Sequence, residues 1–415
     1  MLNIGNKQLT LSIILFVLVM LEILSMVDLL IKYDRVTVSI CAFAISLSIG
    51  ILVMLKAPTP MSPSRPFPTW ILALGCVILT WVTIHNAQIL LRKVPVDYRL
   101  ADMLPIMQIM SKRFLDGQQV YAIIPEIWGD MQPIYLPAMW MPYIPSVMGN
   151  FDPRWITVFF TLLAVAVPLL LLPKKHKNTW WSLLLIPALA VLFRQFLKLD
   201  VQYITLCDEG VVVGWYVLLG WALWKGNPYL IGTFIAISVL SRLSVVGFIP
   251  AYMIWLFFFQ SRTKAIRVAI TGGSVGLVLM VVSQAIFHIK VFTDLPRRYL
   301  EAIMGNDFQK LQGAIQEGLG IAKMLPQSAF PTLAMADKVL AFAVPLLLVG
   351  IYARFRSHFD SRWFPIGMLK IGLVVFFNLL IIPIITLFYA STFLSVAMLA
   401  FYLQDDGNIN STAEI

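Results

Sequence analysis

Apolar stretches about as long as a bilayer-spanning helix recur along the whole chain, separated by short polar stretches. Because a spanning helix needs about 20 mainly apolar residues, we expect an all-α polytopic membrane protein with about twelve transmembrane helices. The expected membrane domain covers residues 1–403, and a cytoplasmic tail follows at 404–415. The expected spans are Leu9–Ile31, Val36–Leu55, Thr69–Leu91, Ile156–Leu172, Thr179–Leu197, Asp208–Lys225, Tyr229–Ser241, Val245–Phe259, Ala265–His288, Lys338–Tyr352, Trp363–Ile382 and Ile385–Tyr402.

The composition agrees with a membrane protein. The 415 residues are 60% hydrophobic and 13% charged, whereas a soluble domain is about 45–50% apolar and about 25% charged. The formal net charge of +10 therefore does not indicate a nucleic-acid partner, because basic residues of membrane proteins collect in cytoplasmic loops. The three cysteines, Cys41, Cys76 and Cys207, are too few and too scattered to predict a disulfide framework or a metal site.

The charges of the loops predict the orientation. With the N-terminus in the cytoplasm, the short inner loops hold most of the basic residues and the outer loops are nearly balanced, as the positive-inside rule requires. Two large loops then face outward, at residues 92–155 and 289–336. This assignment holds only if Pro133–Gly149 does not cross the bilayer. Its four prolines argue against a spanning helix, and we expect a re-entrant segment that dips into the interface and returns.

The first outer loop contains an expected amphipathic helix. Met103, Ile106, Met107, Met110 and Phe114 recur three and four residues apart. This spacing places them on one face of a helix that lies flat at the membrane interface.

Asp102 stands at the start of this helix and has two interpretations. As an N-cap, its carboxylate would only satisfy backbone N–H groups of the first helical turn. As a functional residue, it would be held at the membrane surface and face a cavity beneath the helix. Asp97 is a second candidate carboxylate in the same loop.

Several short motifs follow one another in the order of a known superfamily. An acidic residue, an amphipathic helix, Gly-x-x-x-Tyr and Tyr-Leu-Pro occur here as Asp102, Gly117, Tyr121 and Tyr135-Leu136-Pro137. This order resembles the GT-C superfamily of polyprenyl-phosphate-dependent membrane glycosyltransferases, and most closely its bacterial alpha-mannosyltransferase-like branch. The resemblance covers Val96–Arg267. Its second part consists of Leu199-Asp200-Val201-Gln202, Gly232 and Arg242, at which the family usually has lysine.

The resemblance implies a function. Such an enzyme transfers a single sugar from a polyprenyl-phosphate donor to an extracytoplasmic acceptor glycan or lipid, with inversion. A carboxylate, Asp102 or Asp97, would act as the general base, and cations would neutralise the leaving phosphate. We expect a bacterial inner (cytoplasmic) membrane protein whose active site faces the periplasm; a divalent metal, which some members use, stays open. The implied phosphate-binding residues are Arg242, Arg99, Arg154, Lys198, Arg297 and Arg298, and the implied substrate-binding residues are Tyr121, Tyr135, Asp200 and Gln202.

Several of these residues have structural alternatives. Arg154 could pair with Asp152 to close the re-entrant turn, and Arg297-Arg298 could be a solvated or headgroup-binding pair. Asp208-Glu209 could cap the span that follows, because negative charge is favoured at a helix N-terminus. Three further charges within or near the ends of spans are expected to pair inside the bundle, and no function is assigned to them: Glu22, Asp28 and Lys370.

Two other classes of protein compete with the enzyme. A transporter or flippase of lipid-linked saccharides would also have about twelve spans, but such proteins commonly consist of two related halves with polar residues near mid-membrane. No such halves are evident in this sequence. The third class is a non-catalytic scaffold for envelope assembly. The polar residues gathered in the outer loops favour the enzyme.

Overall fold

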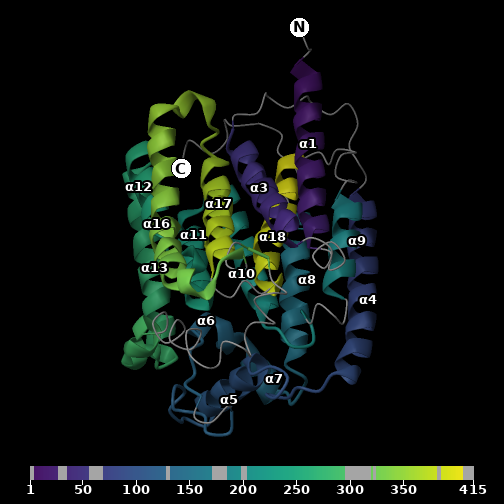
Figure 1. Cartoon of the computed structure of the whole chain (residues 1–415), viewed down its shortest axis with the longest axis vertical. Helices are drawn as coiled ribbons and strands as arrows, with labels where there is room; N and C mark the ends of the chain where they lie inside the picture. The colour runs from purple at the N-terminus through teal and green to yellow at the C-terminus, as the bar shows by residue number, and fades with distance from the viewer. Residues whose placement is uncertain are drawn as a thin grey trace.

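The structure is a computed structural model that describes residues 4–26, 35–55, 69–127, 131–170, 185–197, 203–294, 319–320, 324–380 and 385–404. Within these ranges the regular elements are helices, and the β pairing consists of two isolated bridges, Leu55–Phe359 and Ile124–Met131. The expectation of an all-α chain is therefore confirmed. Figure 1 shows long helices standing side by side, with a group of short helices gathered at one end.

Helices occur at every stretch where a span was expected. Over the described residues, four are long and apolar enough to cross a membrane: α3 (Arg35–Met54), α4 (Thr69–Lys93), α13 (Arg262–Val282) and α16 (Phe330–Arg354). The others are shorter or less apolar, so the structure supports a membrane protein while the number of crossings stays a prediction. They are α1 (Ile4–Ser25), α8 (Arg154–Leu170), α9 (Leu185–Phe196), α10 (Glu209–Lys225), α11 (Pro228–Ser241), α12 (Phe248–Phe259), α17 (Phe364–Leu379) and α18 (Ile385–Gln404).

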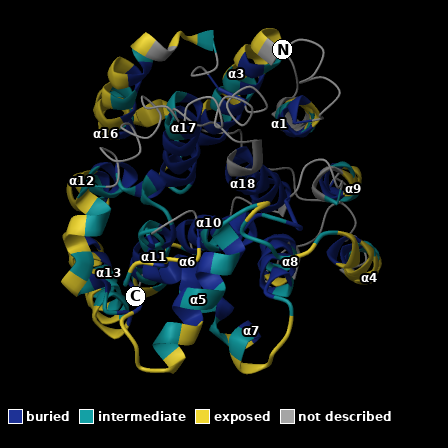
Figure 2. Cartoon of the chain, turned by 60° about the horizontal axis from the view of Figure 1, so that its bottom comes forward, coloured by how far each residue is buried: buried dark blue, intermediate teal, exposed yellow. Residues whose placement is uncertain are grey.

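The peripheral helices expose large apolar side chains. Trp70 and Trp81 on α4 are 64% and 66% exposed, and Ile270 on α13 is 63% exposed. Figure 2 shows α4 and α13 at the margin with many exposed residues, whereas α10 and α17 lie inside and are mostly buried. A broad exposed apolar surface is unfavourable in water and suits contact with lipid.

A buried ionic network joins the first helix to the last two. The Lys370 Nζ on α17 lies 2.6 Å from the Glu22 Oε1 on α1 and donates to the Ser391 Oγ on α18 at 2.6 Å. Ser46 on α3 also donates to the Glu22 Oε1, at 2.7 Å. Both charges are almost fully buried. The expected pairing of Glu22 with Lys370 inside the bundle is confirmed; Asp28 lies outside the described residues.

The segment between α4 and α8 begins and ends at the same end of the bundle. Its helices are α5 (Met103–Leu115), α6 (Pro137–Trp140), η1 (Met141–Tyr143) and α7 (Ile144–Met148). Arg154, the first residue of α8, donates to the carbonyls of Leu91 and Val94 at the end of α4, at 2.9 and 2.6 Å. The proline-rich stretch therefore breaks into short helices and does not cross the bundle. We call this region, shown at the bottom of Figure 1, the α5–α7 end.

Several helix boundaries differ from the expected ones, and two of them adjoin the expected second outer loop. α16 begins at Phe330, not at Lys338, with a proline in its first turn, and Asp337 inside the helix is only 8% exposed. α13 ends at Val282, not at His288, since Gln284 adopts a positive φ of 64° that no helix continues through. Residues 330–336 therefore belong to a helix and not to the second outer loop.

Candidate functional site

Asp102 lies at the α5–α7 end, at the N-cap position of α5. Among the described residues its side chain makes no capping hydrogen bond to the helix. Burial raises the pKa of the Asp102 carboxyl, although nearby backbone N–H groups oppose the rise. The carboxylate is thus partly buried and makes no side-chain capping bond to the helix.

Asp97 has a structural use in the same loop. Its Oδ1 accepts from the Arg99 N–H at 2.9 Å, and its carbonyl accepts from the N–H groups of Leu100 and Ala101. These contacts form the turn that leads into α5. Arg99 is exposed, with its guanidinium 5.9 Å from the centre of the Tyr98 ring.

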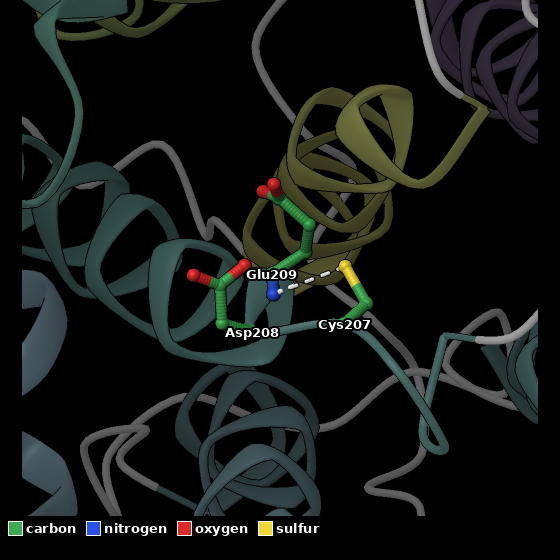
Figure 3. A group of neighbouring side chains, drawn as sticks. All are labelled: Cys207, Asp208 and Glu209. Atoms are coloured by element: carbon green, nitrogen blue, oxygen red, sulfur yellow. Dashed lines mark hydrogen bonds between the residues drawn. The ribbon is translucent and has the colours of Figure 1, made fainter. Parts of the chain in front are cut away.

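The start of α10 brings a second pair of acids to the same end. Gly210 lets α10 approach α8 closely, because a Cβ there would lie 2.4 Å from the Thr157 carbonyl oxygen. The Thr157 hydroxyl donates to the carbonyl of Cys207 at 3.2 Å and fixes the preceding turn. Figure 3 shows the side chains of Cys207, Asp208 and Glu209 spreading from the first turn of α10.

Asp208 is fully buried, and neither of its carboxylate oxygens has a hydrogen-bond partner among the described residues. It stands in the turn just before α10, at its N-cap position, but its side chain makes no capping bond to the described helix. Burial raises the pKa of Asp208, the positive charge of Arg242 opposes the rise, and the charge of Asp102 adds to it. Asp102 and Asp208 therefore lie close enough to influence each other electrostatically.

Glu209 and Arg242 form an ion pair across the site. The Arg242 Nη2 contacts the Glu209 Oε1. The Glu209 side chain is 1% exposed, whereas that of Arg242 is 24% exposed. Arg242 is therefore paired with a buried carboxylate inside the bundle, while part of its side chain is exposed at the surface.

A break between α11 and α12 presents Arg242. The expected interruption at Ser241-Arg242-Leu243-Ser244 is confirmed: α11 ends at Ser241, Arg242 is extended, and the 3₁₀ helix η4 (Leu243–Val245) follows. A hydrogen bond between the Tyr216 hydroxyl on α10 and the Ser244 hydroxyl fixes η4 beside α10. This break places Arg242 at the α5–α7 end, opposite the start of α10.

Arg154 serves the fold. It is 3% exposed, and its guanidinium contacts both Asp152 oxygens, with Nη2 to Oδ2 at 2.5 Å. Its remaining donors reach the carbonyls of Leu91, Val94 and Thr205. The structure therefore contains the Arg154–Asp152 pair, which was the alternative to a phosphate-binding role. Every nitrogen of the Arg154 guanidinium donates a hydrogen bond within the protein.

Tyr121 and Tyr135 meet within the first loop. The Tyr121 hydroxyl donates to the Tyr135 carbonyl and accepts from the Trp140 indole N–H, both at 3.2 Å. Tyr121 is 2% exposed, and its ring lies 5.5 Å from that of His288 and 5.4 Å from that of Phe292. Tyr121 thus joins the segment between α4 and α8 to the segment that follows α13, and it offers little surface to a substrate.

Five sequence-predicted site residues lie outside the described residues, so the structure places none of them. They are Lys198, Asp200, Gln202, Arg297 and Arg298.

The acids Asp208 and Glu209 were not expected in the site. An acidic pair before an apolar helix has the same pattern as an ordinary helix cap. One feature of the sequence separates this pair from an ordinary cap. Gly210, directly after the acids, allows the start of α10 to pack closely on α8. Only the tertiary contacts reveal that Glu209 pairs with Arg242 and that Asp208 is buried without a partner among the described residues.

Cys207, Asp208 and Glu209 could hold a metal ion by spacing, since their ligand atoms lie within 4.8 Å of one another. Two of the three are already engaged: the Cys207 Sγ accepts the Glu209 N–H at 3.4 Å, and Glu209 holds Arg242. The Arg242 guanidinium thus already supplies one positive charge beside these carboxylates. The three ligand atoms are close enough together for a metal ion, but the Cys207 sulfur and the Glu209 carboxylate already have partners.

No known protein-family model matches the chain, and no curated protein or solved structure does.

Proposed function

We propose that this chain is a membrane glycosyltransferase that moves one sugar from a polyprenyl-phosphate donor to an extracytoplasmic acceptor glycan or lipid. The observation that supports the proposal is the buried Asp208, whose pKa is influenced by the charges of both Arg242 and Asp102. Asp102, at the start of α5, and the partly exposed Arg242 thus lie at the same end of an apolar bundle. The motif resemblance to the GT-C superfamily points to the same chemistry.

In the proposed reaction, Asp102 takes the proton of the acceptor hydroxyl as a general base. The hydroxyl oxygen attacks the anomeric carbon, and the bond from that carbon to the phosphate oxygen breaks. The bonding electrons leave with the polyprenyl phosphate, whose charge Arg242 stabilises through its forked donors. A single displacement of this kind inverts the anomeric configuration.

Glu209 has a positioning role in this scheme. Its carboxylate is buried and contacts the Arg242 Nη2. Because a charged hydrogen bond fixes the direction of the guanidinium plane, Glu209 keeps the remaining Arg242 donors toward the surface, where a phosphate can approach.

A transporter or flippase of lipid-linked saccharides is the second candidate, and the network around Glu22 and Lys370 is the observation that favours it. Charges inside a membrane often mark a translocation pathway. Here both charges are paired, and the cavity beside Glu22 measures about 10 Å³, close to the space one water needs. That size suits a structural network better than a passage for a saccharide.

The test compares three isosteric variants in membranes supplied with a long-chain polyprenyl-phosphoryl sugar. Asp102→Asn should slow transfer by about 10²–10⁴-fold, because a general base contributes about that factor. Asp97→Asn tests the rival base, and Asp116→Asn, an exposed acid after α5, is the control. Since burial raises the pKa of Asp102, wild-type activity should fall with decreasing pH at a higher value than an ordinary aspartate would give.

The outcomes separate the hypotheses. Full activity in Asp102→Asn together with loss in Asp97→Asn would move the base to Asp97. Full activity in both variants would remove the mechanism. Transport of a lipid-linked saccharide without any transfer would favour the second candidate.

A further inference from the structure

A group of exposed basic side chains lies at the end of the bundle opposite the α5–α7 end. Figure 1 shows α12, α13 and α16 side by side along one edge. α13 begins where α12 ends, and α16 ends beside them, because the Arg356 guanidinium donates to the carbonyl of Phe259, the last residue of α12, at 3.4 Å. We call the exposed basic residues at these helix ends the basic corner: Arg262, Lys264, Arg267, Arg354 and Arg356.

The positive charges of the basic corner are not balanced within the described part of the chain. None of its side chains forms an ion pair there. Asp360, the acid between α16 and α17, instead accepts the N–H groups of Arg362 and Trp363 with its Oδ1, at 2.8 and 3.3 Å. Arg262 and Lys264 also stand in the first turn of α13, where positive charge is unfavourable. An anion from outside the described chain would therefore stabilise the corner.

Large apolar side chains are exposed directly beside these cations. Phe258, in the last turn of α12, is 68% exposed, and Ile266, one turn after Arg262 on α13, is 55% exposed. The Arg262 guanidinium lies 5.1 Å from the centre of the Phe257 ring. Exposed apolar surface thus continues from the cations along the sides of both helices. Basic side chains at the end of an apolar helix face are typical of the headgroup region of a bilayer.

We propose that the basic corner binds the phosphate headgroup of an anionic phospholipid, whose acyl chains lie along the exposed apolar faces of α12 and α13. Clusters of about four to eight basic residues at the ends of membrane helices are typical of sites for such headgroups. An acidic peptide would match the cations but leave Phe258 and Ile266 exposed. A zwitterionic phospholipid would match the apolar faces but bring its own positive charge to the corner. An anionic phospholipid complements both surfaces.

The experiment measures equilibrium binding of single phospholipids to the purified full-length protein in detergent, by native mass spectrometry. Wild-type protein should bind phosphatidylglycerol at least about fivefold more tightly than phosphatidylcholine with the same acyl chains, because one basic residue near an anionic lipid is worth about that factor. Arg262→Gln/Lys264→Gln should weaken phosphatidylglycerol binding by about five- to twentyfold. Phosphatidylcholine binding should stay within about twofold, because its headgroup has no net charge.

Arg92→Gln/Lys93→Gln is the matched control. It also removes two exposed positive charges from the end of one spanning helix, α4, but at the α5–α7 end. Its affinity for phosphatidylglycerol should stay within about twofold of the wild-type value. Arg354→Gln, on α16, should weaken phosphatidylglycerol binding by about three- to fivefold, because the corner is built from more than one helix. This variant also replaces the first one if Arg262→Gln/Lys264→Gln is not recovered.

Equal affinity of the wild-type protein for both phospholipids would overturn the proposal, as would unchanged phosphatidylglycerol binding in the corner variants. Glycerol phosphate tests the headgroup alone: displacement of the lipid at equal concentration would identify a site for free phosphate and not for a phospholipid. A peptide with the acidic sequence of residues 405–415 tests the remaining occupant. If it displaces phosphatidylglycerol at equal concentration, the corner binds an acidic peptide and the proposal is wrong. No sugar is present, so the result is independent of the proposed transfer.

Discussion

Replacement of Asp208 by asparagine should make the protein more stable while it slows sugar transfer. Asparagine has nearly the same shape as aspartate but no charge. In the structure Asp208 is fully buried, and neither carboxylate oxygen has a partner among the described residues. The substitution therefore removes an ionised group from a buried position without opening a cavity.

The magnitude follows from two opposing effects. Burial disfavours the charged form of Asp208, and the attraction of Arg242 favours it. Burial is the larger effect, because the pKa of the group is raised. A buried polar group without a partner costs about 1–3 kcal/mol, and a charged one costs more. Asparagine keeps the unpartnered oxygen but loses the charge, so we expect a gain of about 1–2 kcal/mol at neutral pH.

The gain should depend on pH in a defined direction. A group whose pKa is raised on folding stabilises the folded state when it is protonated, and this contribution is lost as the pH rises through the folded-state pKa. At neutral pH the wild-type protein is therefore expected to be less stable than Asp208→Asn. The advantage of Asp208→Asn should shrink as the pH falls and vanish well below about 4, the ordinary pKa of aspartate, where the side chain is protonated in both states.

Thermal unfolding in detergent over a series of pH values tests this expectation, with transfer activity measured on the same preparations. Asp116→Asn provides the control for loss of an exposed charge and should change neither quantity. Activity should fall in Asp208→Asn, because a charge retained at a cost in stability is typical of a functional site. A variant less stable than wild type at neutral pH would refute the reasoning, since it would mean that a bound cation neutralises Asp208 in the native protein.

Two further predictions concern ions. Dialysis against EDTA should leave transfer within about twofold, because Arg242 already occupies the Glu209 carboxylate, one of the three groups that a metal would need; a tenfold loss restored by a divalent cation would contradict this. Lys370→Met should destabilise the protein by about 3–5 kcal/mol, since it leaves the Glu22 carboxylate buried without its cation. Thermal unfolding should show that the double variant with Glu22→Gln recovers most of this loss, and a double variant as unstable as Lys370→Met would show that the pair is not coupled.

The positions of the helices could be predicted because apolar length is a local property of the sequence. The break at Arg242 was predictable for the same reason: an arginine flanked by serines interrupts a long apolar run. Helix α16 shows the limit of this reasoning. Its expected start is Lys338, directly after the charged Asp337. The helix begins at Phe330, with a proline in its first turn, and contains the buried Asp337.

The site was only partly predictable, because a charge at a helix end has the same pattern whether it caps the helix or faces a ligand. Asp102, Arg154 and Asp208 all stand at helix starts. Arg154 is engaged by Asp152 and by backbone carbonyls, whereas Asp102 and Asp208 make no capping bond to the helices described. Contacts between residues far apart in sequence decide which charge is structural.

An arginine at position 242 suits the charge balance of the site better than a lysine would. Two acids, Asp208 and Glu209, act on the one cation at position 242, and both are buried. A buried lysine loses its proton readily, whereas an arginine stays charged. Its forked donors also allow it to contact Glu209 with one nitrogen and to offer others to a phosphate. In the proposed reaction, the anionic donor therefore meets a cation that stays charged beside two buried carboxylates.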